Sequence, residues 1–143
     1  LDPQARHLVW ERLYRLKQQG VTQVLTTHYM DEAEQLCDRL VVMDEGRIVD
    51  EGAPAELIAR HVTREVVELR FADDGQRAAA LPWLEVSGHR TEDLPDRVLV
   101  YADDGDAVAA RVAADGVGHA AVLVRRSSLE DVFLKLTGRT LVE

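Results

Sequence analysis

The sequence predicts an α/β segment, residues 1–62, followed by a small α+β domain, residues 63–143. Residues 21–27 are almost entirely apolar or threonine, as strands buried on both faces of a parallel sheet are. Residues 64–143 instead show strand and helix patterns in the order β-α-β-β-α-β-α. That order is typical of a split βαβ, ferredoxin-like domain with an added C-terminal helix.

Composition is that of a globular chain, with 46% apolar residues and a net charge of −9. No run approaches the roughly 18 apolar residues of a membrane span. The acidic excess is four residues in 1–62 and five in 63–143, and no basic stripe interrupts it. We therefore expect no nucleic acid partner. Cys37 is the only cysteine, which excludes an intrachain disulfide and fits a reducing cytoplasm. Its helical spacing from Met30 and Ala33 predicts a core position.

The first helix is predicted to run from Pro3 to about Gln19. Asp2 is a good N-cap, proline is favoured at the first helical position, and Gly20 occupies the place of a C-cap. Helical spacing predicts a buried face made of Ala5, Leu8, Val9, Leu13 and Leu16.

One histidine, His28, follows the apolar strand 21–27, and a short acidic helix, residues 30–37, comes next. We interpret Asp31, Glu32 and Glu34 as a solvated first helical turn, favourable against the helix dipole, and expect no metal site there. Strands 40–43 and 47–50 are predicted to form a hairpin around Glu45-Gly46, followed by a helix over residues 54–60.

In the second part, strand 64–71 alternates as a half-exposed strand does. A helix over 76–81 is predicted to end at Pro82, because proline interrupts helices. Strands 83–88 and 97–102 are predicted to flank a polar loop, residues 90–96. A helix over 106–114, a strand over 120–125 and a last helix capped by Ser127 and Ser128 complete the order.

Candidate sites in this second part are few. The run Asp103 to Asp106 looks like part of a calcium loop, but the glutamate that such a loop requires further on is missing. We favour a helix start. Arg125 and Arg126 at a strand end are expected to be solvated, and His89 and His119 lack flanking ligands. The five histidines have no paired spacing, which makes a metallohydrolase a weak hypothesis.

Residues 24–54, VLTTHYMDEAEQLCDRLVVMDEGRIVDEGAP, resemble the switch-histidine region of ABC-transporter ATPases. Residues 127–139, SSLEDVFLKLTGR, resemble the ending typical of the branch that exports drugs and polyketides. The opening Leu1-Asp2-Pro3 resembles the D-loop of the same family. The resemblance thus covers both ends of the chain, and the middle only through its architecture.

This resemblance implies that His28 is the switch histidine, which hydrogen-bonds the γ-phosphate of ATP and helps hold the attacking water. An imidazole suits the task because its two nitrogens can donate and accept at the same time. Leu1 and Asp2 would lie at a subunit interface. The full-length subunit would use ATP and Mg, pair with a second ATP-binding subunit and with a membrane-spanning transporter subunit, and lie on the cytoplasmic inner face of the cell membrane.

The sequence contains no G-x-x-x-x-G-K-[ST] loop to cradle phosphates and no LSGGQ-type signature. We therefore expect a part of a longer ATPase subunit that is inactive alone and holds no cofactor by itself. The alternative is a regulatory or dimerisation module with no ATPase role, and Walker-type sequence encoded in frame before Leu1 would favour the first hypothesis.

Overall fold

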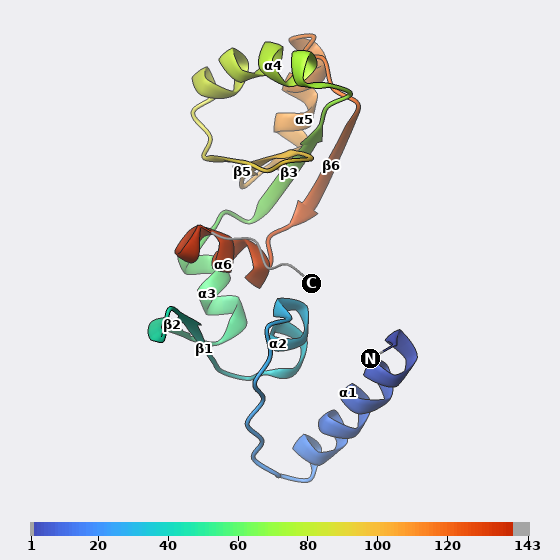
Figure 1. Ribbon diagram of the computed structural model, residues 1–143, viewed down its shortest axis with the longest axis vertical. Coiled ribbons are helices and arrows are strands. Elements are labelled where there is room, and N and C mark those ends of the chain that lie inside the picture. Colours follow the sequence, from blue (N-terminus) through green and yellow to red (C-terminus); the bar gives the residue numbers. More distant parts are fainter. Residues whose placement is uncertain (1, 139–143) are drawn as a thin grey trace. The chain divides into compact units, whose positions relative to one another are not determined.

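The protein is described by a computed structural model that places residues 2–138. It forms two compact units (Figure 1). The first unit consists of residues 1–57 together with residues 128–143, and the second of residues 58–127. Helices and antiparallel sheets make up these units, which is consistent with the predicted α/β segment followed by a small α+β domain.

Helix α1 (Pro3–Gln18) begins and ends where the sequence predicts. The Asp2 carboxylate accepts a hydrogen bond from the backbone N–H of Ala5 at 2.9 Å, and Gly20, with φ +82°, lets the chain leave the helix. The predicted buried face is wrong, since no residue of α1 is buried. Leu8 is 62% and Val9 46% exposed, and Ala5, Leu13 and Leu16 are half-buried. Helical periodicity identifies an apolar face, but the described residues cover that face only where α2 contacts it.

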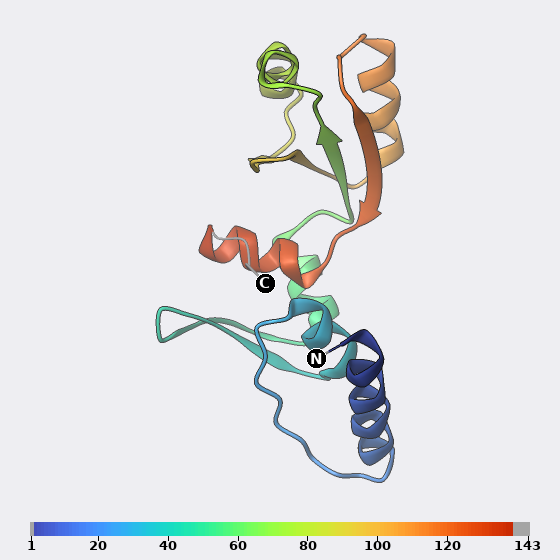
Figure 2. The same ribbon diagram turned by 45° about the vertical axis from the view of Figure 1, so that its right-hand side comes forward.

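The predicted strand over residues 21–27 is not formed among the described residues. The segment is extended but unpaired (Figure 2), and the Val24 side chain is 96% exposed. A strand of a parallel sheet needs neighbours to satisfy its backbone groups, and residues 2–138 supply none here. The apolar pattern predicts a buried strand, but the described residues leave this segment exposed and without a neighbouring strand.

Helix α2 (Met30–Leu36) leads into the predicted hairpin of β1 (Leu40–Asp44) and β2 (Arg47–Gly52). Glu45 and Gly46 form its two-residue turn, both with positive φ (50° and 73°), as the tight turns that match strand twist require. A register shift at Val42/Met43 places one extra residue on β2, a β-bulge.

Two further helices have residues in the first unit. Helix α3 (Pro54–His61) buries Leu57 completely and continues into the second unit. Helix α6 (Leu129–Thr137) starts at the predicted Ser128 cap, where Ser128 and Asp131 form a capping box. It ends at Gly138 with φ +71°. Arg139, the last residue of the motif at 127–139, lies outside the described residues.

The second unit has the predicted ferredoxin-like topology, but the C-terminal helix that was predicted as an addition to it, α6, belongs to the first unit. The elements of the second unit follow the order β-α-β-β-α-β, and the sheet order β4-β5-β3-β6 is antiparallel throughout. The elements are β3 (Glu65–Arg70), α4 (Asp74–Val86), β4 (Thr91–Asp93), β5 (Val98–Ala102), α5 (Gly105–Ala114) and β6 (Ala121–Arg126).

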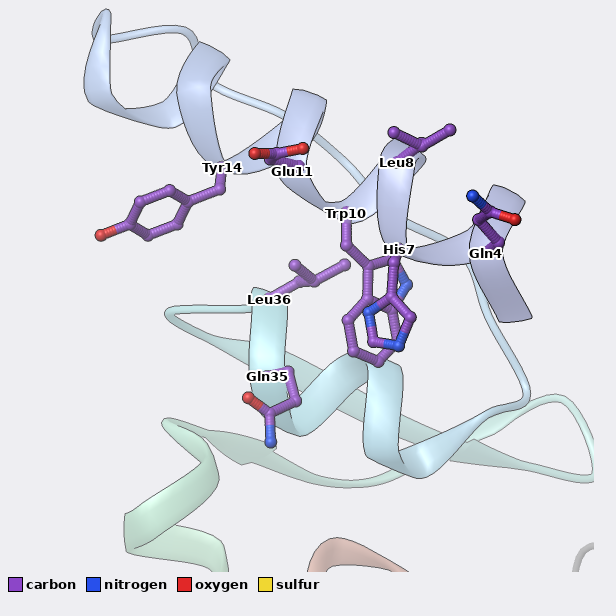
Figure 3. Close-up of a pocket in the computed structure, with 8 residues that line it drawn as sticks. All are labelled: Gln4, His7, Leu8, Trp10, Glu11, Tyr14, Gln35 and Leu36. Atoms are coloured by element: carbon purple, nitrogen blue, oxygen red, sulfur yellow. The ribbon is translucent and has the colours of Figure 1, made fainter.

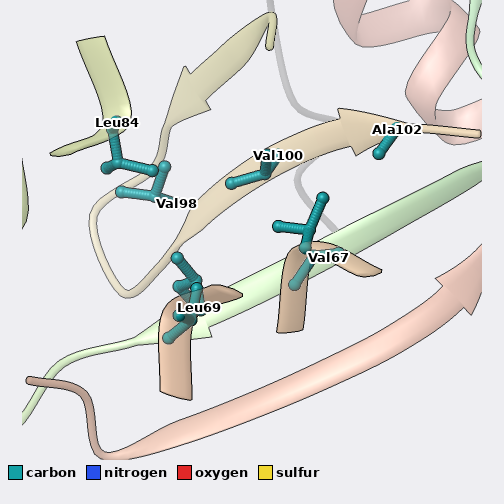
Figure 4. Close-up of a cluster of buried hydrophobic side chains, with 8 residues drawn as sticks. Val67, Leu69, Leu84, Val98, Val100 and Ala102 are labelled. Carbon is teal, nitrogen blue, oxygen red and sulfur yellow. The ribbon is translucent and has the colours of Figure 1, made fainter. Parts of the chain in front are cut away.

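The core of this unit lies between the sheet and its two longer helices. Side chains of β3 and β5 pack against Leu84 of α4 and against Val108 and Val112 of α5 (Figure 4). Gly105 is required at the start of α5, because a Cβ there would lie 2.5 Å from Cγ1 of Val124. The sheet residues in this core are Val67, Leu69, Val98, Val100 and Ala102.

Strand β3 is not half exposed, as its alternation predicted. Residues Val66 to Leu69 are all buried, and β3 is a central strand between β5 and β6. The alternating polar position, Glu68, is only 7% exposed. Its carboxylate lies 3.2 Å from Nε of Arg97 and accepts a hydrogen bond from Nε of Arg125 at 2.5 Å, so its charge is compensated.

Helix α4 passes through Pro82 and continues to Val86, so both the predicted helix end and the predicted strand 83–88 are wrong. Leu84 is 4% exposed, and the indole N–H of Trp83 donates to Asp115 at 2.8 Å. Packing beyond the proline thus outweighs the backbone hydrogen bond that it removes. The short strand β4 lies within the segment predicted as a loop.

Candidate functional site

The segment between α1 and α2 determines where His28 lies. Residues 21–27 are extended, and the chain bends at His28. The hydroxyl of Thr27 accepts a hydrogen bond from the backbone N–H of Tyr29 at 3.0 Å. This local turn leaves His28 exposed between an unpaired extended segment and the first turn of α2.

The His28 ring is exposed and stacks against Tyr29, with ring centroids 4.2 Å apart and a tilt of 34°. Across residues 2–138 no hydrogen bond or ion pair engages its nitrogens. Both nitrogens are therefore available to a ligand. An imidazole in this condition can donate to a phosphate oxygen and accept from a water molecule.

Side chains of helix α1 contact Tyr29 and the first turn of α2, just after His28. The Arg6 guanidinium contacts the carboxylate of Asp31 at 3.4 Å and lies 5.8 Å from the ring centroid of Tyr29. The indole N–H of Trp10 donates to Glu32 at 3.1 Å. Asp31 and Glu32 are thus engaged by α1 and do not simply face solvent as interpreted. These partners lie 25 and 22 residues apart, so local spacing gave no signal for them.

A pocket opens between α1 and α2, separate from His28 (Figure 3). The rings of His7 and Trp10 meet edge to face in it, with centroids 5.8 Å apart. Both polar and apolar side chains line this pocket. The lining residues are Gln4, His7, Leu8, Trp10, Glu11, Tyr14, Gln35 and Leu36.

The structure places Asp2 at the N-terminus of α1, where its carboxylate caps the helix. Leu1 lies outside the described residues. Within residues 2–138 no hydrogen bond or ion pair joins Asp2 to His28. The interface role of Leu1 and Asp2 stays a prediction.

Two aspartates of the run that resembles part of a calcium loop accept hydrogen bonds from backbone N–H groups. Asp103 accepts a hydrogen bond from the N–H of Arg64 at 3.1 Å, and Asp104 caps α5 by accepting from Ala107 at 3.1 Å. Over the described part of the chain, no group of three or more His, Cys, Asp or Glu side chains is arranged to hold a metal ion.

Cys37 is half-buried and follows the last residue of α2. Burial raises the pKa of its thiol, and the nearby carboxylates of Asp38 and Glu32 raise that pKa further. A thiol in these surroundings is protonated near neutral pH, which makes it a poor nucleophile. The predicted core position is wrong, because Cys37 is only half-buried.

Known proteins match along the whole chain. The family described as Nodulation factor export protein NodI, C-terminal domain, matches residues 76–138. The Nod factor export ATP-binding protein I of Burkholderia thailandensis is 47% identical over 140 residues, 97% of this chain and 44% of that protein. Its counterpart in Mesorhizobium japonicum is 43% identical over 143 residues, 100% of this chain and 41% of that protein.

The chain is homologous to the C-terminal part of an ABC-transporter ATP-binding subunit. It spans less than half the length of these relatives. The resemblance inferred from the switch-histidine region and from the closing motif is thereby confirmed. Of the helices formed by residues 2–138, none combines the length and the apolar character needed to cross a bilayer.

Proposed function

We propose that this chain belongs to the ATP-hydrolysing subunit of an ABC exporter, which couples ATP binding and hydrolysis to the export of a small molecule. The observation that carries the proposal is the exposed His28 ring, which stacks on Tyr29 and whose nitrogens have no hydrogen-bond or ion-pair partner among residues 2–138. His28 lies between the extended residues 21–27 and the short helix α2. This order of elements matches the switch-histidine region that it resembles, which supports a role at the γ-phosphate.

We propose that this chain does not by itself hold magnesium and the phosphates of ATP. The sequence has no glycine-rich phosphate loop, and the described carboxylates do not converge on a cation. In our proposal those groups come from the rest of the subunit, and His28 adds one contact to them. The chain alone would then be inactive and without cofactor.

The proposed partners are a second ATP-binding subunit, reached in part through Leu1 and Asp2, and a membrane-spanning transporter subunit. The relatives are named as export ATP-binding proteins, which supports a subunit that works with a membrane protein. We place it on the cytoplasmic inner face of the membrane. The ferredoxin-like domain would adjust assembly or activity.

The decisive experiment replaces His28 by alanine in the full-length subunit. Turnover of ATP should fall roughly 10²- to 10³-fold, as happens when one positioned polar group is removed from a transition state. Binding of ATP should be nearly unchanged, because most binding contacts lie elsewhere.

The matched control is His89→Ala, which removes an exposed histidine from the second unit and should leave turnover unchanged. The isolated 143-residue chain is the negative control and should show no hydrolysis. Normal turnover in the His28 variant would reject the switch role and leave the regulatory or dimerisation module as the alternative.

A further inference from the structure

The acidic side chains of α2 contact two different helices. Asp31 and Glu32 contact Arg6 and Trp10 of α1, whereas Glu34 contacts the N-terminus of α6. Positions 32 and 34 differ by about 200° around a helix of 3.6 residues per turn, so they point in nearly opposite directions. Helix α2 is therefore held from both sides.

The contact with α6 is one hydrogen bond. Oε1 of Glu34 accepts from the backbone N–H of Leu129 at 2.8 Å, across 95 residues of sequence. The first N–H groups of a helix have no partner inside the helix. In α6, Asp131 accepts from the N–H of Ser128 at 2.8 Å within the capping box. Glu34 supplies the acceptor for the next N–H, that of Leu129.

Water has little access to the N–H of Leu129 and so cannot easily replace the Glu34 carboxylate as its acceptor. Leu129 is 1% exposed and Asp131 is 2% exposed, so water has little access to the start of α6. A carboxylate at a helix N-terminus is also favoured by the helix dipole, and hydrogen bonds to charged acceptors are stronger than neutral ones. Loss of Glu34 would leave the N–H of Leu129 without a partner.

We infer that Glu34 is a positioning residue that anchors the His28 segment on α6. Helix α2 has seven residues, too few to be stable without tertiary contacts. The segment before it is unpaired, so it cannot fix His28 either. The position of the His28 imidazole therefore depends on the contacts that α2 makes with α1 on one side and with α6 on the other. This inference rests on the proposed role of His28.

Amide hydrogen exchange on the 143-residue chain tests the anchor without any need for ATP. Glu34→Ala should speed exchange about tenfold at Leu129 and at the amides of α2, because a partly buried hydrogen bond is lost. Glu34→Gln keeps an acceptor oxygen and should retain most of the protection. Glu130→Ala is the matched control, since it removes the same charge from an exposed site on the first turn of α6.

Kinetics of the full-length subunit test the consequence for His28. Glu34→Ala should lower kcat for ATP hydrolysis roughly 10- to 100-fold, because small displacements of a positioned group reduce rates strongly. The KM for ATP should change little, and Glu34→Gln should restore part of the rate. A purely structural role would lower the thermal midpoint and leave kcat at 25 °C unchanged.

Unchanged exchange in α2 of Glu34→Ala would overturn the anchor, and unchanged kcat would overturn its link to His28. Failure of the proposed function has a different signature. In that case His28→Ala would keep full turnover, or the wild-type subunit would not hydrolyse ATP, while the exchange difference between Glu34→Ala and Glu130→Ala would still appear.

Discussion

Among single residues, Cys37 offers the most direct chemical probe of the first unit. Burial and nearby carboxylates raise its pKa, and the thiolate is the form that reacts with alkylating agents. At a given pH, a raised pKa means less thiolate. Alkylation by iodoacetamide should therefore be slower than for an unfolded cysteine at neutral pH, and its rate should rise with pH over a range displaced upward.

Mass spectrometry of the alkylated chain at several pH values measures this rate. The same chain in concentrated urea is the reference, since unfolding removes the burial that shifts the pKa. Equal rates in the two conditions near pH 7 would show that Cys37 is accessible and that the end of α2 is not packed as described.

Residues at helix ends also show what local sequence can predict. Asp2 and Ser128 were identifiable as caps because the capping preference acts over three or four positions. Glu34 was not identifiable as the acceptor for Leu129, because 95 residues separate the two. Likewise, the contacts of Asp31 and Glu32 with α1 depend on tertiary structure, which no spacing rule contains.

On the scale of secondary-structure elements, α4 contains an uncommon feature, an exposed proline in its interior. Pro82 cannot donate to the carbonyl of Ala78, and its ring opposes helical geometry there. Pro82→Ala should stabilise the chain by about 2 kcal/mol, the helix penalty of proline less its effect on the unfolded chain. Thermal denaturation should show a midpoint several degrees higher.

Glu85→Ala is the control on the same helix, and as an exposed substitution it should change stability by less than about 0.5 kcal/mol. A loss of stability in Pro82→Ala would mean that a bend at the proline is needed for the Trp83 contact with Asp115.

The elements that were predicted well are those whose signals are local. The hairpin around Glu45-Gly46 follows from a turn that favours glycine and from short flanking strands. The order of elements in the second unit was predicted from alternating patterns and breaks, but its second strand is β4 at Thr91–Asp93 and not residues 83–88. Strand 21–27 and the end of α4 were predicted wrongly, since the first depends on neighbours that the described residues lack and the second on packing beyond a proline.

For the molecule as a whole, uncovered apolar surface predicts self-association. Leu8, Tyr14 and Val24 are 62%, 56% and 96% exposed, and residues 21–27 offer unpaired backbone groups to another chain. The face of α6, by contrast, is a poor candidate, because Leu129 and Val132 are buried. The charge of −9 opposes association but is screened beyond about 8 Å at physiological salt.

Light scattering over a hundredfold concentration range should therefore show a dimer that dissociates on dilution. Val24→Glu should shift this equilibrium toward monomer by placing a charge on the extended segment. Val86→Glu is the matched control, because Val86 is also highly exposed, at 83%, but belongs to the second unit. A monomer at every concentration would contradict the prediction.

The strand order of the second unit also bears on how the protein is made. Strand β3 is synthesised first, yet its neighbour β6 ends only at Arg126, about 60 residues later. At translation rates of about 5–20 residues per second, β3 is complete roughly 3–12 seconds before β6, and both of its edges lack a partner until β5 has been synthesised. During that interval the apolar residues Val66, Val67 and Leu69 can contact other nascent chains, so the yield of folded protein should depend on chaperones as well as on final stability.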